Sequence, residues 1–550
     1  MKKVLKKFNE SPTITTSLLI VLFLLLNWVS YGAYMRFDLS NTGRLRLTDK
    51  TKEILKNLPD NVIVEGFFSG EVPASHVQQL KYLKDFLKEY AAVSKGKFQL
   101  IFLDPDSDEE AKERADFLGI RSARMGSIDQ KKQEISSVYF SIALSYGAEN
   151  QIINNVLNVR QLEYELTSRI YKMAHPGERK IGFLANHGDF HSRDAQKQTD
   201  AFHSLQGFKQ TIETVYGNLV DVDTAKNDVP SDITTLVIAG VTKLSPLDMF
   251  RIDQYLMRGG KLIVAQSGMN LSFQSGMVTP AAPEIIEFFA NYGVLLSSSM
   301  IYEKKNFMAY RTRGALPFQV LEIPYPLWVV AVDDYMDKNN IITKELPNLF
   351  LPWTSSVSAD ENKLIKDSDT KASILIKSSK SAYEQSNNVL INPQAVSIAF
   401  EQDNQTVSQY NLGVLIEGKF KSKFTAETLP DEAPKDFIKE GERPGMILAV
   451  GSPYAISNMG IMQSQGINGS FFLSALHLMN GMKDLVEIRS TEIENPPLPA
   501  MEPAKKNTLT MLNFILPLAF FAGFGMIVFY RRKKLAEIPV SSFGEKKKKK

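Results

Sequence analysis

The chain has 550 residues, of which 44% are hydrophobic and 23% are charged, and its formal net charge at pH 7 is +3. This length predicts two to four folded domains, and so small a net charge gives no reason to expect nucleic acid as a partner. The sequence contains no cysteine, which excludes disulfides, thiol nucleophiles, dithiol redox motifs and cysteine-bound metal clusters.

Two stretches without charged residues, 13–35 and 507–530, lie near the two ends of the sequence. Each exceeds the roughly 20 residues that a helix needs to cross about 30 Å of hydrocarbon, so we expect two transmembrane helices. Basic residues in 1–12 and 531–550 favour a cytoplasmic location for both ends, with the basic tail at the anionic inner leaflet. Residues 36–506 would then face outward from a bacterial cytoplasmic membrane. If the first stretch is instead a cleaved signal peptide, this region still lies outside.

Residues 36–177 show the pattern of a small α/β module. Apolar and amphipathic runs predict the order strand, helix, strand, helix, two strands, helix. In chain order these elements cover 62–68, 77–90, 98–106, 108–118, 137–146, 150–156 and 159–173. This is the order of a thioredoxin-like layer. The position after the first strand reads SGEVPAS, without a dithiol, so we expect a binding or packing module and no redox role.

Residues 178–490 predict a second α/β domain, in which helices separate the strands of a doubly wound parallel sheet. The predicted strands are 179–186, 218–223, 234–240, 259–266 and 445–454, with a short last strand at 485–490. The predicted helices are 194–216, 245–257 and 468–479. Periodicity weakens between about 297 and 412, which we interpret as an insertion containing strands. Residues 491–506 are rich in proline and charge and are expected to form a tether.

Candidate ligand-binding residues follow three of the predicted strands. Ligands of such sheets bind at the carboxyl ends of the strands. We therefore expect ligand contacts from seven residues, namely Asn186, His187, Gly188, Asp189, Gly240, Ser267 and Gly268.

His187, Asp189 and His191 alternate along the chain, and this spacing leaves two interpretations open. They are metal ligands if the loop presents them on one face, which would make the protein a membrane-tethered, metal-dependent envelope enzyme. Otherwise the segment is a structural loop, with Gly188 for tight backbone geometry and Asp189 or Ser192 capping the following helix.

Other catalytic motifs give no candidate, so we predict no catalytic residue and no cofactor. Ser267 follows a strand, but it lacks the G-x-S-x-G frame of a nucleophile elbow and has no evident triad. The paired carboxylates Asp104/Asp106 and Asp333/Asp334 are expected to cap turns or face solvent. A phosphate-binding GxxxxGK[ST] motif is missing from the sequence, so this chain cannot supply an ATPase.

Four segments together resemble the gliding-motility-associated ABC-transporter auxiliary proteins of the GldG type. They are IGFLANHGD, LVIAGVTKLSPLDMFRIDQYLMRGGKLIVAQ, NNIITKELPNLFLPWTSSV, and GMILAVGSPY followed by NGSFFLSALHLMNG. The resemblance spans nearly the whole chain, and the order of the segments is its most specific feature. One departure is the turn at residues 451–454, where family members usually carry an acidic Gly-Asp turn. This puts a ligand role for the turn in doubt.

The resemblance implies a non-enzymatic, extracytoplasmic subunit that acts with a separate ATPase and a separate multi-helix permease. An envelope polymer, a protein or a solute would be its cargo. It also implies that the second domain is similar to intraflagellar-transport proteins and to class I glutamine amidotransferases without their catalytic machinery.

Overall fold

The structure is a computed structural model that describes residues 47–490, with short gaps, and isolated residues between 511 and 533. The gaps are 130–131, 157–158, 176–178, 194–199, 315–318, 361–362, 364–369 and 402–404. The chain divides into two compact units, Met1–Ile493 and Glu494–Lys550. The sheets and the candidate site belong to the first unit.

No helix among the described residues is long and apolar enough to span a bilayer. Of the two expected transmembrane segments, 13–35 lies outside the described residues, and 507–530 is described only at isolated positions. Both expected transmembrane helices therefore stay predictions.

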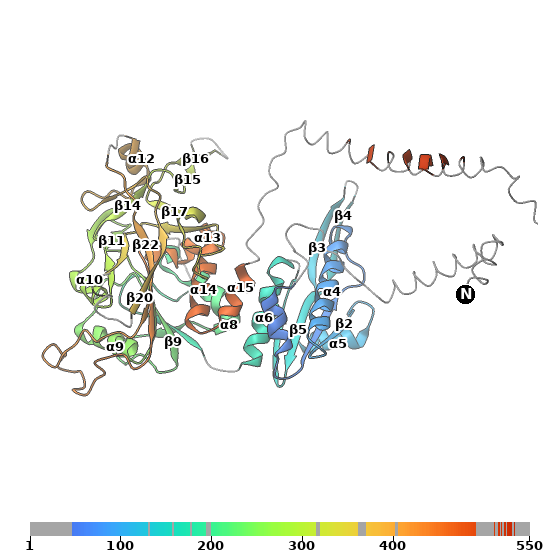
Figure 1. Cartoon of the computed structure of the whole chain (residues 1–550), viewed down its shortest axis with the longest axis horizontal. Coiled ribbons are helices and arrows are strands. Elements are labelled where there is room, and N and C mark those ends of the chain that lie inside the picture. The colour runs from blue at the N-terminus through green and yellow to red at the C-terminus, as the bar shows by residue number, and fades with distance from the viewer. Residues whose placement is uncertain are drawn as a thin grey trace, which may run out of the picture. The chain divides into compact units, whose positions relative to one another are not determined.

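A four-stranded sheet with the order β2-β1-β5-β6 forms the first module (Figure 1). β1 pairs in parallel with β2 and antiparallel with β5, and β5 pairs antiparallel with β6. This order and these directions agree with the predicted thioredoxin-like layer. The strands are β1 (Val62–Phe68), β2 (Phe98–Leu103), β5 (Phe140–Tyr146) and β6 (Glu149–Ile153).

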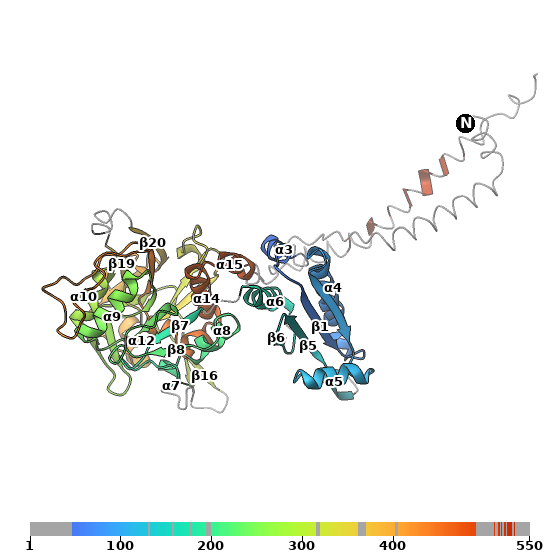
Figure 2. The same cartoon turned by 90° about the horizontal axis from the view of Figure 1, so that it is seen from below.

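Helices cover both faces of this first sheet. Successive residues of a strand point to opposite faces, so one strand contributes side chains to two cores. Val64 is buried in one hydrophobic cluster with Leu87 of α4 and Leu166 of α6. Phe67, on the other face, shares a smaller cluster with Ala115 of α5. Figure 2 shows α5 on the side of the sheet away from α4 and α6. The helices are α4 (Ala74–Val93), α5 (Glu109–Phe117) and α6 (Val159–Ala174).

Three elements of the first module were not predicted from the sequence. The strands β3 (Ala123–Asp129) and β4 (Lys132–Val138) pair as an antiparallel hairpin. The helix α3 (Asp49–Lys56) begins after Thr48, whose side chain accepts a hydrogen bond from the backbone N–H of Thr51. This is the N-cap arrangement that satisfies a free amide at a helix start.

A seven-stranded sheet with the order β20-β22-β23-β10-β9-β7-β8 forms the second module. Five of its strands, β23, β10, β9, β7 and β8, run parallel, as the sequence predicts. The other two, β22 and β20, were not predicted as strands of this sheet; β22 is antiparallel to β23, and β20 is antiparallel to β22. The strands are β7 (Lys180–Leu184), β8 (Val220–Val222), β9 (Ile233–Ala239), β10 (Lys261–Ala265), β20 (Thr370–Lys377), β22 (Asn411–Gly418) and β23 (Gly445–Val450).

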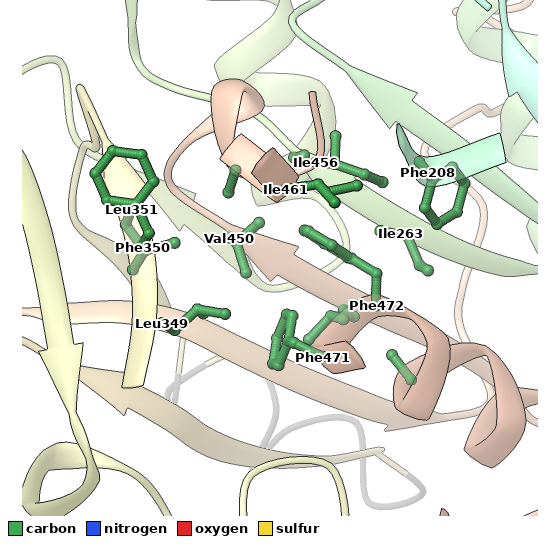
Figure 3. Close-up of a cluster of buried hydrophobic side chains, with 14 of the residues drawn as sticks. Phe208, Ile263, Leu349, Phe350, Leu351, Val450, Ile456, Ile461, Phe471 and Phe472 are labelled. Atoms are coloured by element: carbon green, nitrogen blue, oxygen red, sulfur yellow. The ribbon is translucent and has the colours of Figure 1, made fainter. Parts of the chain in front are cut away.

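Two hydrophobic cores lie on the two faces of the second sheet. On one face, Ile263 and Val450 of the sheet pack with Phe208 of α8 and with Phe471 and Phe472 of α14, as Figure 3 shows. The opposite core contains α9 and α10. Burial of the helices' apolar faces on both sides is the main stabilisation of such a sheet. The helices are α8 (Gln206–Tyr216), α9 (Pro246–Met257), α10 (Pro283–Ala290) and α14 (Ile467–Met479).

The region 297–412 contains two-stranded pairings, as expected for an insertion with strands, but its strand β20 joins the main sheet. The predicted boundary of the insertion therefore cuts through the sheet. The paired strands are β14 (Met300–Glu303) with β21 (Ala382–Gln385), β15 (Tyr310–Arg313) with β16 (Val320–Ile323), and β17 (Trp328–Val332) with β18 (Asn348–Pro352). In a further pair, β13 (Val294–Leu296) with β19 (Val357–Ala359), β19 contacts β20 and β22 of the main sheet. The helix α12 (Pro393–Glu401) comes later in the chain.

The predicted last strand at 485–490 is wrong, because these residues belong to a helix, α15 (Lys483–Ser490). Leu485, Val486 and Ile488 suggested a strand through their apolar and β-branched side chains. In the structure Leu485 and Ile488 are fully buried in the core that contains α8 and α14. Packing of α15 against α14 and α6 overrides the weak local preference for a strand.

Candidate functional site

The loops that follow β7, β9 and β10 meet at the carboxyl edge of the second sheet. Gly188 forms an isolated bridge with Val241, and a Cβ at position 188 would lie 2.3 Å from the carbonyl oxygen of Gly240. The backbone N–H of Val241 donates a 2.8 Å hydrogen bond to Oε1 of Gln266. The structure thus brings the three predicted groups of residues to one edge. Glycine is required at 188 because any side chain would collide with the neighbouring loop.

His187 points into this edge and is buried, with 6% of its surface exposed. Its Nδ1 donates a 2.6 Å hydrogen bond to the carbonyl oxygen of Ala185. Its Nε2 lies 3.1 Å from Oγ1 of Thr224 and 3.1 Å from Oδ1 of Asp248. Both ring nitrogens are therefore occupied by partners within the fold. His187 joins the loop after β7, the loop after β8 and the first turn of α9.

Asp248 completes this network from the start of α9. Its Oδ2 accepts hydrogen bonds from the backbone N–H and the hydroxyl of Ser245, at 2.9 and 2.6 Å, and its Oδ1 accepts one from Thr224 at 2.8 Å. Burial by itself raises the pKa of this carboxyl group. The hydrogen bonds from Ser245, His187 and Thr224 outweigh burial, and the pKa of Asp248 lies below its ordinary value.

The structure does not support a metal site at His187, Asp189 and His191. Within the part of the chain that the structure describes, no group of three or more histidine and acidic residues could hold a metal ion. His187 is turned inward, whereas Asp189 is exposed. Nδ1 of His191 lies 3.2 Å from the carbonyl oxygen of Arg193. The three side chains do not converge, because Gly188 and the bridge at Val241 turn the chain between them.

Asn186, Gly188 and Asp189 are the predicted ligand residues that face solvent. Asn186 adopts a left-handed backbone conformation, with φ of 67°, and its side-chain amide donates a 3.0 Å hydrogen bond to Asp223. This conformation is tolerated by asparagine better than by most other residues. The amide of Asn186 and the carboxylate of Asp189 are thus presented at the rim of the edge.

Ser267 and Gly268 lie inside the fold instead. Oγ of Ser267 lies 2.9 Å from Oγ of Ser355 and accepts a 3.1 Å hydrogen bond from the backbone N–H of Met269. Ser355 in turn donates to the carbonyl oxygen of Ser299 at 2.7 Å. Ser267 is 1% exposed, and none of the hydrogen bonds described for it involves a histidine. It holds two loops together and is not positioned as an activated nucleophile.

A cluster of aromatic rings covers the carboxyl edge, and this aromatic cluster was not predicted from the sequence. Its ring centroids lie 5.0 Å apart for Trp353 and Tyr454, 5.2 Å for Phe190 and Tyr454, and 5.2 Å for Phe273 and Trp353. Phe202 stacks on Phe273 at 5.0 Å. Such tilted and edge-to-face contacts are the preferred arrangements of aromatic rings. The only sequence signal for the cluster was the aromatic FLPW segment, which contains Trp353.

Gly240 and the turn at residues 451–454 fit closely beneath the aromatic cluster. Gly240 has φ of 54°, and a Cβ there would lie 2.3 Å from the ring of Phe190. A Cβ on Gly451 would lie 1.9 Å from the carbonyl oxygen of Ser355. Burial raises the pKa of the Tyr454 hydroxyl, and the Asp189 carboxylate raises it further. The turn thus serves packing, in agreement with the doubt about its role as a ligand site.

Chemically, the described edge offers a rim of polar groups around aromatic rings. Phe202 and Phe273 are only partly buried, whereas Phe190, Trp353 and Tyr454 are nearly covered. Aromatic faces next to amide and carboxylate groups suit ligands with a ring or a cationic group. His187 and Ser267 could have carried catalysis. Their side chains instead form hydrogen bonds that hold loops together.

Comparison with known proteins gives a family and one protein relative. A family model described as an ABC-type uncharacterized transport system matches residues 178–481, and a domain of unknown function matches residues 41–145. An uncharacterized protein from Borreliella burgdorferi is 24% identical over 443 residues, which cover 76% of this chain and 79% of that protein.

A solved structure also matches part of the chain. It is that of a ThuA-like protein from Bacteroides uniformis, with 11% identity and a TM-score of 0.29, over 56% of this chain and 93% of that one.

Proposed function

This chain belongs to the ABC-type uncharacterized transport system family, and from that membership we propose that it is a non-enzymatic, membrane-anchored auxiliary subunit of an ABC-type transporter. The family match over residues 178–481 is the observation that carries the proposal. A separate ATPase and a separate permease are its proposed partners, since the sequence contains no phosphate-binding loop of its own.

The geometry of the carboxyl edge supports a role without catalysis. His187 has both ring nitrogens engaged, and Ser267 is bonded to Ser355. A general base or a nucleophile needs its reactive atom available to a substrate. The rim with Asn186 and Asp189 and the adjoining aromatic cluster are better suited to binding than to chemistry. We propose that this rim contacts the cargo, an envelope polymer, a protein or a solute.

The uncharged stretches 13–35 and 507–530 support the proposed two-pass topology. In it both ends are cytoplasmic and the two modules lie outside a bacterial cytoplasmic membrane. The finer assignment to the GldG type, with a link to gliding motility, is part of the same proposal. Genes for an ATPase and a permease next to this one would support it.

Co-purification tests the proposal. The affinity-tagged full chain, extracted from its native membranes in mild detergent, should bring down an ATPase and a multi-helix permease that mass spectrometry can identify. A matched chain that ends before Asn507 carries the same tag and should lose both partners. Recovery of the full chain alone would contradict the proposed function.

Protease accessibility tests the topology separately. Protease added to intact spheroplasts should degrade the region 36–506, whereas a protein confined to the cytoplasm survives until lysis. Protection of this region in intact spheroplasts would show that the proposed orientation is wrong.

A further inference from the structure

α6 belongs to the hydrophobic cores of both modules. Leu162, Leu166 and Ile170 lie four residues apart along one face of the helix and are buried in the core of the first module. Tyr164 points away from them and is buried in the core of the second module, together with Ile54 of α3. A helix that buries two faces in two cores is held by both, in contrast to a linker that connects them loosely.

A buried histidine fixes the second-module face of α6. Nε2 of His477, on α14, lies 2.8 Å from the hydroxyl of Tyr164, and Nδ1 lies 3.0 Å from the hydroxyl of Tyr216 on α8. A neutral imidazole has one N–H donor and one acceptor nitrogen, so one ring can satisfy both hydroxyls. Burial raises the pKa of Tyr216 well above its ordinary value, so this hydroxyl keeps its proton.

The first helix of the described body, α3, is tied to α6 at its start. Oε1 of Glu163 accepts hydrogen bonds from the backbone N–H and the hydroxyl of Thr48, at 2.8 and 2.9 Å. The hydroxyls of Thr51 and Thr167 lie 3.4 Å apart beside this pair. Burial raises the pKa of Glu163, while its hydrogen bonds with Thr51 and Thr48 act in the opposite direction.

The last helix of the body, α15, meets α3 at the same place. Nζ of Lys50 lies 3.1 Å from Oδ1 of Asp484 and also contacts Glu53 at 3.2 Å. Leu485 and Ile488 of α15 are fully buried in the core that contains Tyr164. The two helices that lead to the ends of the folded body thus pack beside each other and against α6.

We propose that α3, α6 and α15 form an attachment joint that holds both ends of the body together and transmits any displacement of the adjoining segments to both modules at once. In the proposed function, two membrane segments would move this joint. The inference therefore rests on the proposed function for the source of the movement. The mechanical coupling of α3, α6 and α15 to the modules is a property of the folded body and can be tested without partners.

The experiment measures the distance between the modules in the full chain. Because the natural sequence has no cysteine, Glu110→Cys in α5 and Glu284→Cys in α10 place two spin labels at exposed positions without competing sites. Pulsed electron paramagnetic resonance should give one narrow distance distribution. Asp484→Lys, which turns the attraction to Lys50 into repulsion, should broaden this distribution and shift its mean.

A matched control comes from Lys180 and Asp232, an ion pair within the second module at 2.9 Å. Its side chains are 39% and 46% exposed, against 33% and 45% for Lys50 and Asp484. Asp232→Lys should leave the distribution unchanged, and the charge swap Lys50→Asp with Asp484→Lys should restore it. If the ion pair has only a local role, Asp484→Lys will leave the distance distribution unchanged, as Asp232→Lys should.

Tyr164→Phe tests the buried side of the joint, since it removes the hydroxyl at His477 and keeps the ring. It should broaden the distribution while thermal unfolding shows that the protein still folds. A distribution unchanged by both Asp484→Lys and Tyr164→Phe would overturn the proposed coupling. Failure of the ATPase and the permease to co-purify would contradict the proposed function and leave this measurement valid on the chain alone.

Discussion

Nε2 of His187 lies 3.1 Å from Oδ1 of Asp248, and this contact joins the loop after β7 to the first turn of α9. Thr224, from the loop after β8, touches both side chains. One histidine therefore connects three segments at the carboxyl edge of the second sheet. In the sequence the same histidine suggested a metal ligand.

Replacing His187 by alanine should destabilise the protein without changing any metal content. The substitution removes the hydrogen bond to the carbonyl oxygen of Ala185 and one of the two partners of Oδ1 of Asp248, which keeps Thr224. Loss of a partner by a buried polar group costs about 1–3 kcal/mol. Urea unfolding measures the loss. His175, which is exposed, provides the control, and His175→Ala should change the free energy of unfolding by less than about 0.5 kcal/mol. Equal effects of the two substitutions would contradict the role of His187.

Asp248 should make the protein sensitive to acid. The pKa of Asp248 is lowered in the folded state, so its ionised form stabilises the fold. This stabilisation is fully present at pH values above the pKa of the unfolded state, which is roughly 4. That stabilisation is lost as the pH falls through the lower folded value. Asp248→Asn should therefore lower the free energy of unfolding at pH 7 and flatten its decline below about pH 4.

Chemical denaturation at a series of pH values measures the decline for Asp248→Asn. Asp431→Asn, at an exposed position, should retain the parent's pH profile. A parent-like decline in Asp248→Asn would show that other groups determine the acid sensitivity.

Ser267 should not react as a nucleophile. A fluorophosphonate probe, which labels activated serines, should leave the full chain unmodified, because Ser267 is buried and bonded to Ser355. Ser267→Ala should lower the free energy of unfolding by about 1 kcal/mol through loss of these hydrogen bonds. Labelling at Ser267, found by mass spectrometry of peptides, would contradict its assignment as a structural residue.

Gly240→Ala should be more destabilising than Gly119→Ala, at the left-handed cap that follows α5. Both glycines have positive φ, 54° and 74°, so both substitutions cost about 1–2 kcal/mol of backbone strain. Only at 240 would the new Cβ also collide with Phe190, whereas nothing lies within 4 Å at 119. Overpacking adds about 1–3 kcal/mol. The difference between the two unfolding free energies isolates the contact between Gly240 and the aromatic cluster, and equal losses would contradict it.

The periodic part of the fold was predictable because local pattern and tertiary position agree there. The run 62–68 coincides with β1 (Val62–Phe68), and the predicted helix 245–257 matches α9 (Pro246–Met257), which Ser245 caps. Where local pattern was ambiguous, packing decided the outcome. The segment 485–490 became part of a helix, α15, which packs against α14 and α6 and buries Leu485 and Ile488.

The location of the site could be predicted, but the direction of its side chains could not. Strand order placed Asn186 to Asp189, Gly240 and Ser267 at one edge. Whether His187 points inward depends on Thr224 and Asp248, which no local spacing connects to it. The aromatic cluster was missed for the same reason, since Phe190, Phe273, Trp353 and Tyr454 come from separate segments.

β10 pairs with β23, so Lys261 lies opposite Met446 although most of the second module separates them in the chain. The sheet therefore cannot close until residues near 450 have left the ribosome. Contacts of such high contact order form slowly, and β10 keeps an unpaired strand edge exposed during that interval. The first module, whose β1 and β2 are close in the chain, can fold earlier. Assistance from a chaperone would be needed chiefly by the second module, late in its synthesis.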